Sequence, residues 1–440
     1  MDTAMQDVLT DAALPYLQLI VERLTPQAKD YAAATCAAWR DVVRDVRSRL
    51  LLDFEAMHSC NDSPALNIPW DDDFGDVNNN KQIGAMGENL WIASTFEPYL
   101  SILRSEPENG HVPFSRAPYA ACPVGLSIES FVWDCHPSHR FLYLIGTELG
   151  SITMGGFSSA IYKLYNQVDT DGEYTAPWMT DAERPSADIN FEPEDEGYHG
   201  FSPNQLALHS TDKISLLFVC GRDELVVLDG VHLDDLGSSA SGMRLSKGHF
   251  DNPGGMALHV ERASGEDGVS VDSMQLYVTD FSRDRIVIFT LSVASEDANT
   301  VRETAAARII GRSGDAPGEF QGPCGVVVAE VRGTARLVVC EDRGCRVQVL
   351  TLAGDPLQLI RSGDMGFPSC LPVIQFDEPQ DYPLGLGLVK ERHFCGLSHA
   401  CVSKAWRRVF ILCFDTRSPE DGFGTSLGLQ GMVSLVLPPE

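Results

Sequence analysis

Three short patterns in this sequence contain residue types that could do chemistry. Gly424, Ser426 and Gly428 match the Gly-x-Ser-x-Gly turn that presents a serine nucleophile. That turn needs a histidine partner later in the chain, and the last histidine, His399, lies before it. We therefore assign no catalytic residue to this motif.

The second pattern is a set of two histidines and two cysteines separated by even numbers of residues, with Gly396 among them. On a strand the four side chains would share one face, but at about 3.3 Å per residue they are spread too far apart to meet around one zinc ion. Only a turn at the glycine would bring them together, so we predict no metal site. The four residues are His393, Cys395, His399 and Cys401.

The third pattern, Asp169-Thr170-Asp171-Gly172, is similar to the start of a calcium-binding loop. When the glycine takes the sixth position of such a loop, the last position, which requires a bidentate glutamate, is Trp178. This excludes an EF-hand, although a weak ion site stays open. The sequence also lacks a phosphate-binding loop, and we predict no cofactor.

Two arginines stand at the same place in two similar segments, LYVTDFSRDRIVIFTL and LVVCEDRGCRVQVLTLAG. Arg285 follows Asp280 by five residues, and Arg346 follows Glu341 by five. Each segment reads as a strand, an acid, a four-residue turn, an arginine and a second strand. This recurrence favours a structural ion pair over a ligand contact.

The two segments belong to an internal repeat that organises the chain after residue 83. Each follows a Pro-x-Gly and an apolar strand, and the glycines are Gly255 and Gly325. This arrangement resembles the NHL repeat, which has a Gly/Phe turn, Pro-x-Gly, a strand, "YVAD", a turn, an arginine and a strand. The resemblance implies a β-propeller, a closed ring of short twisted sheets.

Weaker copies of the repeat extend in both directions, and one small residue ends the central strand of each copy. The copies predict a mainly β fold, a six-bladed NHL-type β-propeller over residues 84–440, with an acidic insertion around residues 155–200. Cysteine at this position acts as a small apolar residue. The six repeat positions are Ala93, Gly146, Cys220, Thr279, Cys340 and Cys413.

Residues 1–57 have helical rather than repeat periodicity. We expect a first helix to end at Thr25-Pro26, because the residue before proline is disfavoured in a helix. A second apolar stripe runs from Tyr31 to Leu50. Residues 58–83 contain turn formers and acids without periodicity, and we predict a linker there.

The segment 1–57 resembles an F-box, with two departures: its Leu-Pro start lies two residues late, and Lys29 replaces the usual leucine. The resemblance implies that an apolar helix face docks on a Skp-type adaptor, with Trp39 as the anchor. The alternative is that this face packs against the propeller. The docking residues would be Leu14, Leu17, Ile20, Leu24, Cys36 and Trp39.

The formal net charge of −29 indicates which kinds of molecule the protein is unsuited to bind. Residues 1–57 carry six bases and nine acids, so most of the negative charge belongs to the propeller. Such a field disfavours nucleic acids and anionic membranes. Twelve cysteines without Cys-x-x-Cys pairs, and no basic signal segment, favour a cytoplasmic or nuclear protein with reduced thiols.

These features together predict a non-catalytic adaptor, the substrate-recognition subunit of an SCF-type ubiquitin ligase. It would be a monomer in a hetero-complex and bind a target protein on the propeller face. The alternative is a metal-dependent hydrolase or lyase of the six-bladed propeller type, which requires inward Asp, Glu, Asn or His side chains from several blades. An RNA-binding NHL protein is a third, less favoured hypothesis.

Overall fold

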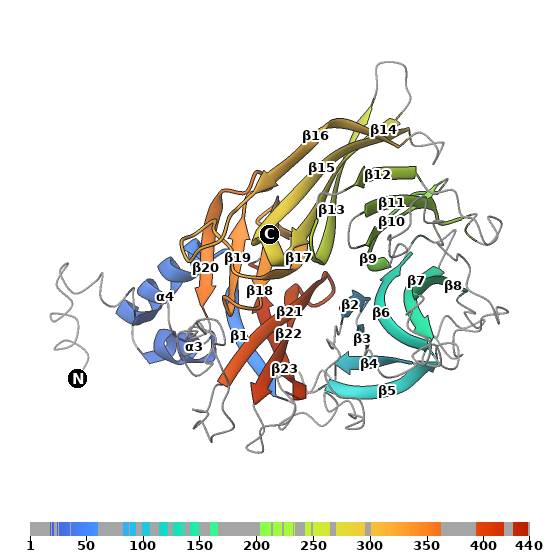
Figure 1. The fold of residues 1–440 in the computed structure, drawn as a ribbon. Coiled ribbons are helices and arrows are strands. Elements are labelled where there is room, and N and C mark those ends of the chain that lie inside the picture. The colour runs from blue at the N-terminus through green and yellow to red at the C-terminus, as the bar shows by residue number, and fades with distance from the viewer. Residues whose placement is uncertain are drawn as a thin grey trace, which may run out of the picture.

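The computed structural model of the chain consists of a ring of β-sheets with a pair of helices beside it (Figure 1). The described residues are 18, 20, 21, 24, 26–35, 37–59, 82–87, 89–93, 99–105, 114–121, 126–134, 136, 141–148, 159–165, 203–212, 214–221, 224–231, 233, 243–247, 250–264, 270–294, 301–361, 393–417 and 426–438.

Antiparallel sheets form the ring, and in every described sheet except the one that contains β1 the chain runs through neighbouring strands one after another. Among the described residues five sheets have four strands and one has three. The predicted mainly β propeller is therefore confirmed. The prediction of a six-bladed propeller is wrong for this part of the chain, because five four-stranded blades are present and the sheet β6-β7-β8 has only three strands.

The first half of the ring contains three sheets. Their strands are β2 (Ile83–Met86), β3 (Asn89–Ala93), β4 (Tyr99–Ser105) and β5 (Phe114–Ala121); β6 (Leu126–Trp133), β7 (Phe141–Glu148) and β8 (Ser159–Tyr165); and β9 (Pro203–Ser210), β10 (Ser215–Gly221), β11 (Glu224–Asp229) and β12 (Met243–Lys247).

The second half contains the two clearest repeats and the sheet that closes the ring. Their strands are β13 (Pro253–Ser264), β14 (Ser270–Asp280), β15 (Arg285–Ala294) and β16 (Arg302–Ile310), with the short helix η4 (Phe281–Arg283); β17 (Pro323–Val331), β18 (Thr334–Glu341), β19 (Arg346–Leu350) and β20 (Pro356–Arg361); and β21 (His393–Ser403), β22 (Arg408–Arg417), β23 (Ser426–Val436) and β1 (Asp53–Ser59).

Strand β1 closes the ring, because this N-terminal strand is the outer strand of the sheet that holds the C-terminal strand β23. Asp53 pairs with Val436 and Ser59 with Gly431. The propeller therefore begins inside the segment 1–57 that the sequence analysis treated as helical. Pairing of the two chain ends in one sheet protects a propeller from opening, because it leaves no break in the ring.

Apolar clusters fill every seam between neighbouring sheets. Val338 of β18 packs in one cluster with Val409 of β22, and Phe218 of β10 packs with Phe289 of β15. The remaining seams hold comparable clusters. The small residues at the six repeat positions are all buried. Each sheet thus buries a face of its neighbour. A single twisted sheet cannot bury its own two faces, so the ring is needed for a core.

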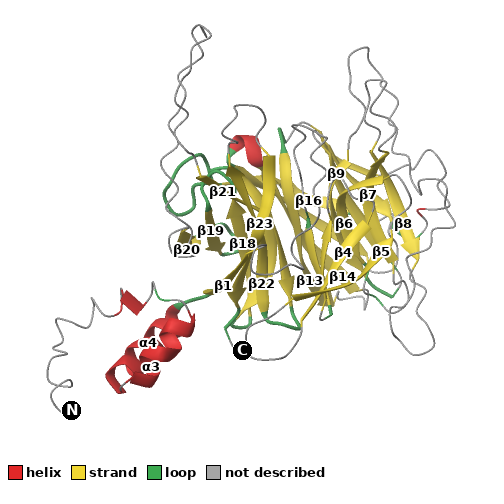
Figure 2. Cartoon of the chain, turned by 90° about the horizontal axis from the view of Figure 1, so that it is seen from below, coloured by secondary structure: helices red, strands yellow, loops and turns green. Residues whose placement is uncertain are grey.

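Two helices, α3 (Pro26–Thr35) and α4 (Ala37–Arg49), form a hairpin that stands off the ring on the side of β1 (Figure 2). The expected continuous stripe from Tyr31 to Leu50 is interrupted between the two helices, and Tyr31 itself is 79% exposed. The hairpin has its own small core of Val21, Val42, Val43 and Val46. None of the described helices has the length and apolar character needed to cross a bilayer.

Candidate functional site

Backbones of neighbouring sheets approach closely where β17 and β18 meet β21, here called the β17/β21 seam. The thiol of Cys324 donates to the carbonyl oxygen of Leu397 at 2.8 Å, and the thiol of Cys340 donates to that of Ser398. A Cβ atom on Gly325 would lie 2.6 Å from the Ser398 oxygen. Only glycine allows this approach.

The preceding seam, between β13 and β17, repeats this arrangement. Thr279 donates its hydroxyl to the carbonyl oxygen of Cys324 at 3.1 Å. A Cβ atom on Gly255 would lie 2.4 Å from that same oxygen. The structure therefore places Gly255 and Gly325, the glycines of the two Pro-x-Gly motifs, where neighbouring sheets approach each other.

The two arginines of the repeat pair with acids of their own sheet. The Arg285 Nε atom lies 3.0 Å from the Asp280 carboxylate, and the Arg346 Nε atom lies 2.8 Å from that of Glu341. Asp280 also accepts hydrogen bonds from the backbone N–H groups of Asp251 and the next residue. Both acids are buried, so each ion pair holds the turn that leads into its sheet.

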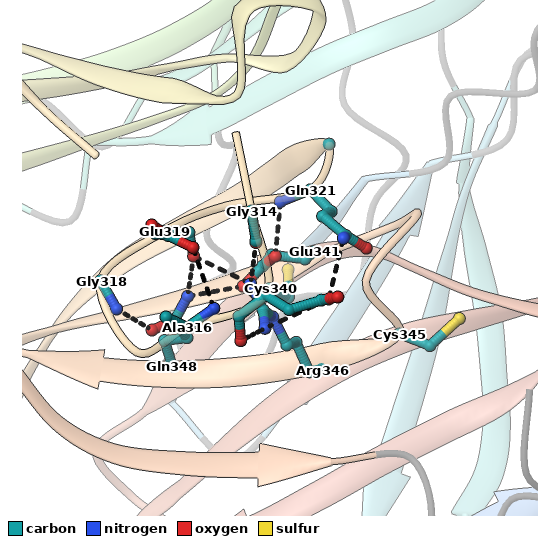
Figure 3. Close-up of polar contacts among 12 residues, drawn as sticks. Gly314, Ala316, Gly318, Glu319, Gln321, Cys340, Glu341, Cys345, Arg346 and Gln348 are labelled. Carbon is teal, nitrogen blue, oxygen red and sulfur yellow. Dashed lines mark hydrogen bonds and ion pairs between the residues drawn. The ribbon is translucent and has the colours of Figure 1, made fainter. Parts of the chain in front are cut away.

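The Glu341 pair is part of a larger polar network (Figure 3). Glu341 also accepts hydrogen bonds from the Gln321 backbone N–H and the Gln348 amide. Arg346 donates to the carbonyl oxygens of Gly314 and Glu319. Burial raises the pKa of Glu341, while the hydrogen bonds from Arg346 and Gln348 act in the opposite direction. The Glu341 carboxylate therefore has a structural role: with Arg346 it holds the turn of residues 314–321.

Asp342, the next residue, has very different surroundings. Its backbone N–H bonds to Gly322, but no described residue donates a hydrogen bond to its carboxylate. The side chain crosses to the next sheet, where a Cβ atom on Gly396 of β21 would lie 2.1 Å from Asp342 Oδ1. Burial raises the pKa of Asp342 to about 6, and the Arg343 charge lowers it only partly. Asp342 is nevertheless only partly buried as a residue.

Sequence analysis missed Asp342, although a signal was present. In the repeat before it the same position, directly after the buried acid, is Phe281. Phe281 also reaches the next sheet, since a Cβ atom on Gly322 would lie 2.9 Å from its ring. An apolar seam position in one repeat is thus a carboxylate in the next.

The Cys324 thiol of the β17/β21 seam is a poor nucleophile. Burial raises the pKa of the Cys324 thiol well above its ordinary value, and the neighbouring Cys340 thiol raises it further. Because only the thiolate reacts, Cys324 stays inert near neutral pH.

Strand β21 contains an irregularity beside the seam. Leu397 pairs with Cys413 and Ala400 with Ile411, so two residues of β21 stand opposite one residue of β22. One of these two is His399, and burial lowers its pKa to about 4. Its imidazole is therefore neutral at pH 7. Such bulges redirect side chains and are frequent near active sites.

The three chemical patterns of the sequence are not assembled into sites in the described part of the chain. No three His, Cys, Asp or Glu side chains come together there as a metal would need. Cys401 packs in the apolar cluster of Ile83, and the side chains of His393 and Cys395 are outside the described set. Ser426 is simply the first residue of β23, and Asp169–Gly172 lie outside the described residues.

The residues expected to dock an adaptor are only partly brought together. Ile20 is 50% exposed, whereas Leu24 and Trp39 pack against the valine core of the hairpin. Neither of these two contacts the ring cluster next to the helices. Leu14, Leu17 and Cys36 lie outside the described residues.

Comparisons with known proteins place the chain by its fold and not by its family. No protein-family model and no curated protein matches it, so the F-box and NHL resemblances have no support from these sources. Among solved structures, regucalcin from Agrobacterium tumefaciens, a calcium-binding protein, has 11% identity and a TM-score of 0.43 over 87% of this chain and 93% of its own. A PQQ-bound aldose sugar dehydrogenase from Streptomyces coelicolor has 12% identity and a TM-score of 0.40 over 82% and 95%.

One prediction from the sequence is corrected by these comparisons. The sequence analysis predicted that the chain is not an enzyme, because no catalytic motif is recognisable in it. The solved structures that match include an aldose sugar dehydrogenase, and a fold by itself does not exclude catalysis.

Proposed function

We propose that the propeller is a hydrolase and that the β17/β21 seam is its site, with Asp342 as general base. The observation that carries the proposal is a mostly buried carboxylate to which no described residue donates a hydrogen bond, facing a glycine of the next sheet. A buried charge without partners is costly, and such groups gather at functional sites. A pKa of about 6 suits a base that works near neutral pH.

The substrate class is an ester or a lactone. Asp342 would take a proton from a water molecule while the water oxygen attacks the carbonyl carbon. When the C–O bond breaks, the protonated carboxyl would return the proton to the leaving alkoxide. No described group of three metal-binding side chains surrounds Asp342, and the step written here uses only this carboxylate and a water molecule.

The test measures hydrolysis of a p-nitrophenyl ester and of small lactones. We expect D342N to lower kcat/KM by about 100-fold or more, within the range general bases supply. Wild-type activity should fall to half near pH 6, where the carboxylate becomes protonated. The control is E330Q, because Glu330 is an exposed acid of the same sheet. Equal rates for wild type and D342N would contradict the proposal.

A second candidate function belongs to the helical hairpin. We propose that it docks on a Skp-type adaptor, as the F-box resemblance implies, while the propeller engages the protein to be modified. Two large apolar side chains favour this, since Ile20 is 50% and Tyr31 79% exposed on a projecting element. This function is compatible with catalysis in the ring.

The docking test is a pull-down with a purified Skp-type adaptor. Replacement of both exposed residues, Ile20→Glu and Tyr31→Glu, should abolish capture without disturbing the valine core. The control is Arg44→Glu, since Arg44 is exposed on the other helix. Capture that is unchanged in the double variant would remove this candidate.

A further inference from the structure

The connection between the helical hairpin and the ring is very short. Helix α4 ends at Arg49 and strand β1 begins at Asp53, so three residues join them. A flexible tether between independent modules needs backbone groups that are free of tertiary bonds. The hydrogen bonds of Leu50, Leu51, Leu52 and Asp53 therefore decide whether the hairpin moves against the ring.

Backbone groups of all three connecting residues are bonded to the sheet β17–β20. The Leu50 carbonyl oxygen accepts a hydrogen bond from Arg332 at 2.9 Å. The side-chain oxygen of Gln358 accepts from the backbone N–H groups of Leu51 and Leu52 at 2.8 and 2.9 Å. Its amide nitrogen donates to the Leu52 carbonyl oxygen at 2.7 Å. One side chain thus makes three hydrogen bonds to two consecutive residues.

The next residue ties the strand back to the helices. Asp53 forms an ion pair with Lys29 of α3, whose side chain is only 1% exposed. Leu52 is buried in the apolar cluster of Val338 and Val409. Each residue from Leu50 to Asp53 therefore has at least one specific bond, and the described contacts leave no position for a hinge.

We infer that the hairpin is a fixed projection of the sheet β17–β20, locked by Gln358 and by the Lys29–Asp53 pair. A molecule bound to the hairpin is consequently held in one orientation to the ring. The inference goes beyond both proposed functions, because it concerns the relative position of two parts of the free chain.

The experiment measures a distance distribution between two spin labels. Labels on genetically encoded amino acids at Tyr31 and Glu303, both exposed, leave the cysteines untouched. We expect a single narrow distribution in the wild type and a distribution at least twice as wide in Q358L. Amide exchange at Leu51 and Leu52 should accelerate at least tenfold in the same variant.

Two further variants make the result decisive. Q358E keeps the oxygen that accepts both N–H groups, so its distribution should stay narrow. Gln275→Leu, in the neighbouring sheet β13–β16 where the side chain bonds to Tyr277 and not to the joint, should leave the distribution narrow. A broad distribution in the wild type, or an unchanged one in Q358L, would overturn the inference. Neither readout depends on substrate or adaptor.

Discussion

Glu341 and Asp342 are adjacent carboxylates with opposite roles. Glu341 accepts hydrogen bonds from Arg346, Gln348 and the Gln321 backbone, which compensate its burial. Asp342 has no comparable donors among the described residues, so its charge is retained at a cost in folding free energy. Residues that lower stability but persist are characteristic of sites where function limits stability.

Replacement of Asp342 should therefore stabilise the fold. In the folded chain its pKa is about 6, against 3.8 for the ordinary carboxyl. Between these values the folded state keeps a proton that the unfolded state has lost, so stability falls as pH rises through this window and stays low above it. The shift corresponds to at most about 3 kcal/mol at pH 7.

We thus expect D342N to gain roughly 1–3 kcal/mol at pH 7 and nothing below pH 3.5, measured by urea denaturation across pH. The gain is smaller than the full shift because the amide is also buried. A loss of stability at pH 7 would show that the carboxylate has a partner that supports it.

Arg346 should behave in the opposite way. Its side chain is 2% exposed and its removal leaves Glu341 as a buried, unpaired charge. We expect R346M to lower the free energy of unfolding by about 3–5 kcal/mol. The matched control is R312M in the same turn, since Arg312 is 81% exposed and should cost less than about 1 kcal/mol. Equal losses would contradict a structural role specific to Arg346.

For single residues, the sequence predicts positions whose residue type recurs between repeats better than a position at which the repeats differ. Asp280, Arg285, Glu341 and Arg346 stood out because the same types recur at the same spacing, and recurrence reflects a shared backbone geometry. The sequence analysis did not identify Asp342, because the two clearest repeats have different residue types at this position. Its burial and its contact with Gly396 depend on a strand more than 50 residues away, which no local pattern contains.

Among the elements, Lys29 explains a mismatch in the helical segment. The F-box pattern places a leucine there, whereas this buried lysine bonds to Asp53 at the start of β1. Helical periodicity therefore predicted the helices, but not that β1 follows three residues later and completes the last sheet. The signal for β1 lies in its partner β23, at the other end of the chain.

The seams between elements depend on glycines that no strand propensity favours. Any side chain at Gly325 would collide with the Cys340 thiol and the Ser398 carbonyl. We expect G325A to cost about 2–4 kcal/mol, as overpacking of a tight core does. The control G333A, at a turn with φ of +67° and open space around it, should cost only about 1–2 kcal/mol of backbone strain. Thermal unfolding of both variants makes the comparison, and a cheaper G325A would mean that the seam can relax.

For the whole molecule, closure depends on a strand that lies at the opposite end of the chain from its partner. Removal of residues 1–49 deletes both helices but leaves Leu52 in its cluster and β1 beside β23. Removal of residues 1–59 deletes β1 as well, which exposes the β23 edge and uncovers apolar surface of the last seam. An unpaired apolar edge strand is a site for aggregation.

The two truncations should therefore differ sharply. We expect the chain that begins at Leu50 to remain soluble with a cooperative unfolding transition, and the chain that begins at Cys60 to aggregate or to lose that transition. Circular dichroism melts and size-exclusion profiles of the two truncated chains supply the measurement. If both truncations unfold alike, ring stability does not depend on β1. The ring would then be held by the seams alone, since each seam has its own apolar cluster and the N-terminal strand would add only a local pairing.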